Sequence, residues 1–514
     1  MKKWISLAMV LMLVLTAGCG KQAQEQAQTQ TTIAATTTTK PSSGNEVVAE
    51  VFDDTEETYE GVKIQLSDDG ITVDGEAISA DDTAAVYIAN DIVYYESGKD
   101  FTYGEGSEKD AHTKEEAEAH TVVHIAKAGQ YVLSGKLSKG QIAIDLGKDA
   151  EDDPEAVVTL VLNGVDITCE VAPAVIFYNV YECGSDDEET ATKEVDLADA
   201  GARVIIANNS DNKVNGSYVA RIYKPGTVEL TEDGTAVADA KKLHKYDAAF
   251  YSKKSMRIQG GNKGNGNGKL SIQAANEGLD TELHLTIDGG IIDIESGNDG
   301  INTNEDNVSV TTINGGRLSI VVNGSTGEGD GIDSNGWLVI NGGTVLAQAC
   351  AFSADAGIDS DKGIHINGGT VVASGSMLDR IESGGQVYAT FFAQSRKTGT
   401  IQLKDKDGNV VLTHEIVNSY SILVVSSLVM AEGYSVWDGD TQLQAGSGQG
   451  GFGPGGTPPG GFGERPDMPS GMQPPHGNRP DKPEGGYPSF PEGMEPPDGV
   501  DGATPPTDGG NLQI

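Results

Sequence analysis

Leu338-Val339-Ile340-Asn341-Gly342-Gly343 is one of five copies of a phrase in which alternating apolar residues are followed by a polar residue and a glycine pair. The first glycines of the copies give a period of 29, 26, 27 and 26 residues and are Gly260, Gly289, Gly315, Gly342 and Gly368. A second phrase recurs at the same period, in the copies Glu277-Gly278-Leu279-Asp280, Asp299-Gly300-Ile301-Asn302, Asp330-Gly331-Ile332-Asp333 and Ala356-Gly357-Ile358-Asp359. Two phrases in phase at one period indicate a repeat architecture.

The period and composition of the repeats predict an all-β fold. Strand-like segments are short and rich in β-branched residues, the turns are rich in Gly, Asn and Asp, and no long amphipathic helix is evident. A period near 26 residues fits one coil of a parallel β-helix, with about three short strands and three turns per coil. Glycine after Asn or Asp allows a positive φ at the corners. We expect one corner to stack at about 4.8 Å in an amide ladder, formed by Asp288, Asn314, Asn341 and Asn367.

The regions around the repeats suggest five parts. Strand signals begin near Val62, so we assign residues 61–375 to the β-helix, with charged insertions near 100–120 and 186–199. We interpret residues 376–445 as a β cap over the open end of the solenoid, with a hairpin turn at Asp407-Gly408-Asn409. The segment 446–514 is rich in Gly and Pro, and we expect it to be disordered.

The first 19 residues have the features of a secretory signal. Lys2 and Lys3 precede an apolar segment that is too short to span a bilayer, and the segment ends at Leu15-Thr16-Ala17-Gly18-Cys19. This ending is similar to a bacterial lipobox, in which Cys19 would be lipidated, although Leu15 stands one place upstream of the usual position. The alternative is an ordinary signal peptide. We expect residues 20–60 to be a flexible tether and the protein to be extracellular, anchored by lipid to the outer face of a bacterial cell membrane.

The composition restricts the partners. The formal charge of −42 argues against nucleic acid, which needs clustered Lys and Arg, and favours the attraction of cations. We expect a monomer. The four cysteines do not form a disulfide framework: Cys19 belongs to the signal, Cys350 is left over, and whether Cys169 pairs with Cys183 stays open.

The second phrase carries the candidate metal site. Its acidic residues would stack about 5 Å apart on neighbouring coils, mostly facing outward, and stacked carboxylates repel each other unless solvent, alternation with Asn or a cation offsets the repulsion. Ca²⁺ prefers such oxygen ligands. The candidate ligands are Asp330, Asp333, Asp355, Asp359 and Asp361, with Asp299 and Asp280 on earlier coils. The alternative is that Asp and Asn are only good turn formers on a solvated edge.

Aromatic residues supply candidate contacts for sugars. Trp337 follows the acidic phrase, and Tyr388 and Trp437 lie in the expected cap, although packing at the end of the solenoid would explain them equally well. Lys362 is the one basic residue that we nominate as a catalytic base, and a charge-balancing surface lysine is the alternative. We find no His and Cys cluster for zinc and no nucleophile elbow.

Four segments carry a family resemblance. They are Ala128-Gly129-Gln130-Tyr131-Val132-Leu133-Ser134-Gly135-Lys136-Leu137, Gln141-Ile142-Ala143-Ile144, Leu160-Val161-Leu162-Asn163-Gly164-Val165-Asp166-Ile167 and Ala248-Ala249-Phe250-Tyr251-Ser252. With the later repeats, they resemble a clostridial family of secreted carbohydrate-binding β-helix lipoproteins over roughly residues 61–445. The resemblance implies a right-handed parallel β-helix with a pectate-lyase-like fold, bound calcium, and binding of cellulose and polygalacturonate without established lyase activity.

Three functions remain open from the sequence. The first is a non-catalytic surface lipoprotein that binds plant cell-wall polysaccharides, cellulose and acidic pectin, with the help of calcium. The second is a calcium-dependent pectate lyase, in which a cation would acidify the proton next to a uronate carboxylate. The third is a structural or adhesive surface protein.

Overall fold

The computed structural model describes residues 51–446, except for the side chains of residues 394–396. The predicted signal sequence, the lipidation site Cys19, most of the tether and nearly all of the Gly- and Pro-rich tail therefore lie outside the described residues. The prediction of an all-β fold is confirmed within them: strands β1 to β33 dominate, and the one α-helix described, α1 (Lys114–Glu118), lies in the first insertion. No described helix has the length and apolar character needed to cross a membrane.

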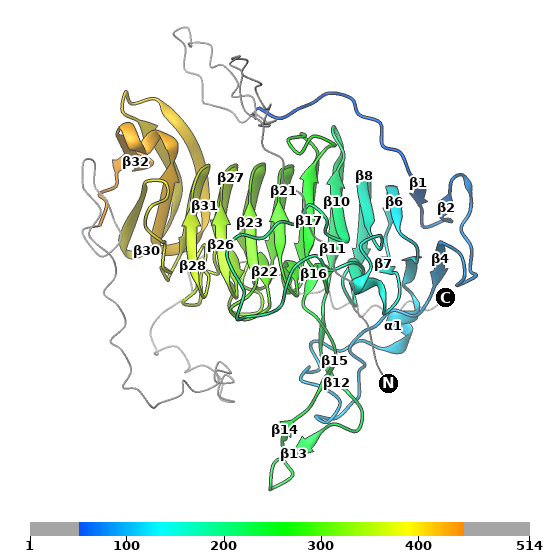
Figure 1. The fold of residues 1–514 in the computed structure, drawn as a ribbon. Helices are drawn as coiled ribbons and strands as arrows, with labels where there is room; N and C mark the ends of the chain where they lie inside the picture. The colour runs from blue at the N-terminus through cyan, green and yellow to red at the C-terminus, as the bar shows by residue number, and fades with distance from the viewer. Residues whose placement is uncertain (1–50, 447–514) are drawn as a thin grey trace, which may run out of the picture. The chain divides into compact units, whose positions relative to one another are not determined.

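Most strands belong to three ladders in which each strand pairs in parallel with its counterpart in the next repeat (Figure 1). Ladder 1 consists of β1 (Val62–Leu66), β6 (Gly129–Leu137), β8 (Val158–Cys169), β10 (Ala202–Ile206), β17 (Met256–Gly260), β20 (Leu285–Ile287), β23 (Val310–Ile313), β26 (Trp337–Ile340) and β28 (Gly363–Ile366). Ladder 2 consists of the second half of β8, then β11 (Asp211–Gly216), β18 (Lys269–Ala274), β21 (Ile291–Ser296), β24 (Arg317–Val322), β27 (Thr344–Gln348) and β29 (Thr370–Gly375).

Ladder 3 contains the copies of the second phrase. Its parallel strands are β5 (Thr121–Ile125), β7 (Gly140–Asp145), β9 (Val175–Asn179), β16 (Ala248–Ser252), β19 (Glu277–Thr281), β22 (Ile301–Thr303) and β25 (Ile332–Ser334). Strand β4 (Val86–Ala89) pairs antiparallel with β5. The short strands β2 (Thr72–Val73) and β3 (Glu76–Ala77) extend β1.

Apolar side chains stack between the ladders. In ladder 1, Ile287, Ile313, Ile340 and Ile366 pair in register and are buried, and Leu279, Ile301 and Ile332 form the matching column in ladder 3. Both columns belong to one contiguous core. Because each residue packs on its counterpart above and below, the hydrophobic alternation of a single repeat is enough to build the whole core.

The predicted amide ladder is confirmed at the corner that follows ladder 1. The Nδ2 atoms of Asn314, Asn341 and Asn367 donate to the Oδ1 atoms of Asp288, Asn314 and Asn341, at 2.8, 2.9 and 2.9 Å. The second glycine of each pair adopts a positive φ, for example 76° at Gly343. Any residue with a side chain would be strained in this conformation.

Antiparallel strands follow ladder 2. β31 (Val410–Ser427) pairs with β29 and β30 (Tyr388–Asp405), and β32 (Tyr434–Asp438) pairs with β30 and β33 (Thr441–Gln442). The predicted hairpin turn at Asp407-Gly408-Asn409 is confirmed between β30 and β31. These strands have their own core, which includes Leu346 and Val372 of ladder 2.

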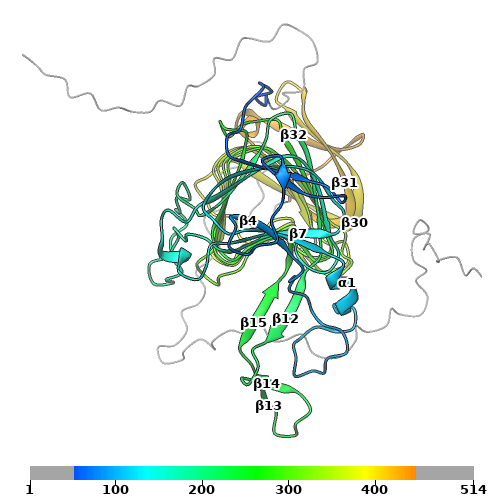
Figure 2. The same ribbon diagram turned by 90° about the vertical axis from the view of Figure 1, so that its right-hand side faces the viewer.

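A hairpin that the sequence did not predict leaves the ladders between β11 and β16. β12 (Val219–Tyr223) pairs with β15 (Lys242–Tyr246), and β13 (Glu229–Leu230) pairs with β14 (Val237–Asp239) at its tip. In both views this hairpin extends away from the ladders (Figures 1 and 2). The second predicted insertion, 186–199, contains no strand, and the cysteines Cys169, Cys183 and Cys350 are free thiols.

We predict that the apolar column contributes more to stability than the amide ladder does. Ile340→Ala should lower the free energy of unfolding by about 2–5 kcal/mol, because it leaves a cavity in the buried core. Asn341→Ala removes two hydrogen bonds at an exposed corner and should cost only about 1 kcal/mol. Urea unfolding of the two neighbouring variants measures the difference; a larger loss for Asn341→Ala would show that the ladder dominates.

Candidate cation site

Ladder 3 stacks the polar residues of the second phrase in register. Asp280, Asn302 and Asp333 pair in sequence along β19, β22 and β25, next to the inward column of Leu279, Ile301 and Ile332. Our expectation that this polar column faces outward is wrong for Asp280, which is 0% exposed. Strand β15 of the unpredicted hairpin lies beside this part of ladder 3: the charge of Lys245 acts on Asp280, and Lys242 and Lys245 pair with Glu282 and Asp247.

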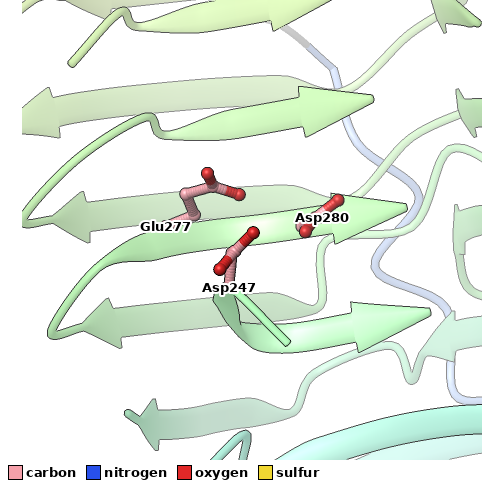
Figure 3. Close-up of side chains that lie close together, drawn as sticks. All are labelled: Asp247, Glu277 and Asp280. Carbon is pink, nitrogen blue, oxygen red and sulfur yellow. The ribbon is translucent and has the colours of Figure 1, made fainter. Parts of the chain in front are cut away.

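Three buried carboxylates gather at the start of ladder 3's acidic column. Glu277 and Asp280 project from β19, and Asp247 immediately precedes β16 (Figure 3). One carboxylate oxygen from each residue lies within 4.8 Å of the others. We call Asp247, Glu277 and Asp280, together with Asn302 on β22, the inner acidic group.

Two lysines neutralise only part of this charge. Lys245 Nζ lies 2.6 Å from Asp247 Oδ2, and Lys242 Nζ lies 3.1 Å from Oε1 of Glu282, a carboxylate that also accepts a hydrogen bond from the Tyr251 hydroxyl. Four carboxylates therefore share two ammonium groups. Neither Glu277 nor Asp280 forms an ion pair in the described part of the chain, so the excess of two negative charges falls on them.

Only some of the side-chain oxygens of the inner acidic group accept a hydrogen bond from the described residues. Asn304 Nδ2 donates to Asp280 Oδ1 at 2.6 Å, and Asn302 Nδ2 donates to Glu277 Oε1 at 3.3 Å. The second oxygens, Glu277 Oε2 and Asp280 Oδ2, and the amide oxygen Asn302 Oδ1 are buried and have no hydrogen-bond partner among residues 51–446. Such groups are costly to bury unless something satisfies them. Two carboxylate oxygens and an amide oxygen are the ligand types that Ca²⁺ takes, so the residues fit a hard divalent cation.

The pKa shifts of Glu277 and Asp280 agree with a cation site. Burial, followed by the charges of Asp280 and Asp247, raises the pKa of Glu277 well above its ordinary value. Burial, followed by Asp247 and Glu282, does the same to the pKa of Asp280. Without a cation, burial favours the protonated forms of Glu277 and Asp280, whereas a divalent cation would favour their ionised forms.

Further along the ladder, the sequence-predicted aspartates form a second cluster, the outer acidic group of Asp299, Asp330, Asp333 and Asp359. The Asp330 amide donates to Asp299 Oδ1 at 2.6 Å, and the Ala356 amide donates to Asp330 Oδ1 at 2.5 Å. Burial, followed by Asp299 and Asp333, raises the pKa of Asp330 well above its ordinary value. No Lys or Arg of the described residues forms an ion pair with Asp299, Asp330 or Asp359.

The remaining predicted ligands lie at the margins of the outer acidic group. Asp355 accepts from the Gly329 amide at 2.6 Å and from the Ser353 hydroxyl. Asp361 is exposed, and its charge contributes to raising the pKa of Asp359. The structure thus brings four of the seven predicted aspartates into one group and assigns Asp280 to another.

Sequence reasoning missed Asp247 and Glu277 as ligands. Glu277 begins the first copy of the second phrase, so its register with Asp299 and Asp330 was a usable signal. Asp247 precedes the segment Ala248-Ala249-Phe250-Tyr251-Ser252, which pairs with β19 but lacks the Asp-Gly-Ile pattern. Its approach to Glu277 and Asp280 depends on the path of the hairpin, which the repeat period does not reveal.

The predicted aromatic residues lie on three different strands. Trp337 begins β26, Tyr388 begins β30, and Trp437 lies in β32, and each is partly exposed. A lysine lies over the ring of each of these two tryptophans: Lys362 Nζ is 5.9 Å from the ring centre of Trp337, and Lys404 Nζ is 4.2 Å from that of Trp437. Trp437 Nε1 also donates to Ser435 Oγ at 2.9 Å, which favours a packing role for this ring. Lys362, the nominated base, therefore lies at the outer limit of cation–π distance from an aromatic ring.

Comparisons with known proteins identify relatives of the chain. Residues 119–391 match a family model described as carbohydrate-binding domain-containing protein. A protein of Acetivibrio thermocellus with the same description is 29% identical over 175 residues, which cover 34% of this chain and 45% of that protein, so the match spans less than half of the relative's length. A solved structure titled as a polysaccharide lyase-like protein from C. thermocellum, in a gadolinium derivative, has a TM-score of 0.35 and 20% identity, and the alignment covers 61% of this chain and 90% of that one.

We predict that the inner acidic group makes stability respond to calcium. Calcium should raise the melting temperature of the wild type, and the double variant Glu277→Gln with Asp280→Asn should lose the larger part of this response, because only the outer acidic group stays intact. In a chelator, the double variant should be at least as stable as the wild type, because it removes uncompensated buried charge. Asp211→Asn, at an exposed position, is the control. Thermal melts measure both effects, and a full calcium response in the double variant would contradict the assignment.

A second prediction concerns pH and the outer acidic group. Burial, followed by the charges of Asp379 and Asp333, raises the pKa of Asp359 to about 7, whereas an unfolded aspartate has a pKa of about 3.9. In a chelator, the folded protein therefore binds more protons than the unfolded chain between these values, so this group's contribution to stability falls as pH rises through the window. The loss should be roughly 2–4 kcal/mol at pH 8.

Asp359→Asn isolates this contribution. The comparison is needed because burial lowers the pKa of His284 and of His414 to about 4, which makes stability rise with pH over part of the same range. In a chelator, the stability of Asp359→Asn relative to the wild type should increase from pH 5 to pH 8. A difference that stays constant with pH in chemical denaturation would refute the raised pKa.

Proposed function

The chain belongs to the family of carbohydrate-binding domain-containing proteins, and from that premise we propose that it is a non-catalytic polysaccharide-binding protein in which calcium assists the binding of acidic glycans. The observation that carries the proposal is the pair of acidic groups on ladder 3. In the inner group the carboxylates outnumber the nearby ammonium groups, and three oxygens have no hydrogen-bond partner in the part of the chain that the structure describes.

We infer that the three ladders are the faces of a right-handed parallel β-helix, with strands β30 to β33 as its cap. The support is the parallel, in-register pairing of successive repeats and the antiparallel strands that continue from β29. Such stacking gives a rigid row of equivalent positions at a spacing of about 4.8 Å. A row of this kind suits a ligand that is itself a linear polymer.

Calcium would reconcile the charge of the protein with an acidic ligand. A formal charge of −42 repels a polyuronate, but a cation held by protein carboxylates can also accept oxygen ligands from the polymer. The outer acidic group suits this role best, because its member Asp333 is partly exposed and Asp361, at its margin, is exposed. The inner acidic group is more deeply buried and suits a structural ion. Acidic pectin is therefore the proposed calcium-dependent ligand, and cellulose the proposed neutral one.

The positions of the lysines favour binding over lyase chemistry. A lyase needs a base that can accept a proton near neutral pH. Burial opposes the charge of Lys245, but the neighbouring Asp247 outweighs it and raises the pKa of Lys245 above its ordinary value, so this lysine holds its proton. Lys362 lies against the Trp337 ring. We further propose that the protein is displayed outside the cell through lipidated Cys19.

We predict that retention on polygalacturonate requires calcium. The wild type should bind immobilised polygalacturonate in millimolar calcium and be released by excess chelator, and Asp330→Asn with Asp333→Asn should weaken this retention at least tenfold. Asp211→Asn should bind like the wild type. Undiminished retention in chelator would exclude a bridging ion, and unsaturated products absorbing in the ultraviolet would establish a lyase instead.

A further inference from the structure

A cavity lies outside the acidic groups, where the first insertion meets the unpredicted hairpin. Its volume is about 770 Å³, and its walls come from residues 92–103 and from the hairpin of β12 and β15. This volume lies within the range of about 300–1,000 Å³ that is typical of small-molecule sites. The family match begins at residue 119, so the wall formed by residues 92–103 is a feature of this chain beyond the matched region.

Backbone and side-chain contacts hold the two walls together. The Tyr223 amide donates to the Tyr103 carbonyl at 2.8 Å, and the Glu105 amide donates to the Arg221 carbonyl at 2.9 Å. Arg221 also pairs with the Glu105 carboxylate at 2.9 Å. The cavity is therefore formed by segments that are fixed to each other over several residues, which makes it a preformed site.

The lining combines aromatic rings with a few polar groups. Tyr94, Tyr103 and Tyr223 contribute three partly exposed rings, and Leu230 and Leu243 are 46% and 43% exposed beside them. Apolar surface left uncovered in this way is characteristic of a ligand or partner site. Tyrosine suits a sugar, because the ring packs against the apolar face of a pyranose while the phenol hydrogen-bonds with its hydroxyls.

The charges of the lining favour a neutral ligand. Glu96 and Asp100 supply two negative charges, and Lys99, the one ammonium group of the lining, already pairs with Glu96 at 2.9 Å. Burial lowers the pKa of His244, which is therefore neutral at pH 7. The remaining negative charge would repel a uronate, whereas carboxylates readily accept hydrogen bonds from the hydroxyls of an uncharged sugar.

We propose that this cavity is a second carbohydrate site, which binds neutral oligosaccharides without calcium. The proposed function supplies the carbohydrate class of the ligand, and the position and the preference for uncharged sugars come from the cavity. Strand β15 connects the two regions: Leu243 and His244 line the cavity, while Lys242 and Lys245 pair with Glu282 and Asp247 beside the inner acidic group. The two sites thus lie along one strand but use different chemistry.

The test is calorimetric titration of the full chain, in excess chelator, with neutral hexasaccharides of glucose, xylose, mannose or galactose. At least one of these hexasaccharides should bind the wild type. Tyr94→Ala and Leu243→Glu should each weaken the affinity for it at least tenfold. Leu428→Glu makes the same change at a leucine outside the cavity, which is 69% exposed, and this control variant should bind normally. Because Leu243 is itself exposed, its variant should melt like the wild type.

The outcomes separate this inference from the proposed function. Absence of binding by every neutral hexasaccharide would overturn the inference, as would equal binding by Leu243→Glu and the wild type. Calcium-dependent retention on polygalacturonate should be unchanged in Leu243→Glu. Loss of polygalacturonate binding alone, with hexasaccharide binding intact, would refute the calcium-assisted function and leave the second site standing.

Discussion

In-register parallel pairing is the constraint on which the rest of the structure depends. It places each position of one repeat directly on its counterpart in the next, about 4.8 Å away. Ile313 therefore packs on Ile340, Asn341 bonds to Asn314, and Asn302 lies between Asp280 and Asp333. Stacking is favourable for apolar side chains, which pack on one another, and for amides, which hydrogen-bond to one another. For a carboxylate, the same stacking creates repulsion that the protein must relieve.

The structure relieves that repulsion in two ways within the protein itself. Asn302 and Asn304 interrupt the acidic column, and the amide of Asn304 donates to Asp280. Lys242 and Lys245 reach the column from the hairpin and neutralise Glu282 and Asp247. Within residues 51–446, neither the amides nor the lysines bond to Glu277 Oε2 or Asp280 Oδ2, and no lysine pairs with Asp299, Asp330 or Asp359. This residual charge is the observation that supports the proposed cation, and the carboxylate oxygens converge in the inner acidic group.

The repeat phrases predicted those features that follow from periodicity alone. The all-β class and the amide ladder follow from one period read by columns. The same columns nominated Asp330, Asp333 and Asp359 together, but they placed Asp355 and Asp361 in that cluster and Asp299 only on an earlier coil. The hairpin of β12 and β15 interrupts that period, so the sequence did not predict where this hairpin lies relative to ladder 3. For this reason the sequence did not predict the burial of Asp280, the approach of Asp247 to the other carboxylates or the cavity beside Tyr103. Non-repeating insertions fold by contacts that no internal copy reveals.

The central claim is that the partnerless oxygens of the inner acidic group bind a divalent cation. A crystal structure of the full chain grown with calcium tests it most directly. The account predicts an ion within about 2.3–2.6 Å of Glu277 Oε2, Asp280 Oδ2 and Asn302 Oδ1, with further oxygen ligands completing its shell. A Glu277–Asp280 carboxyl pair sharing a proton, with no ion at saturating calcium and neutral pH, would contradict it.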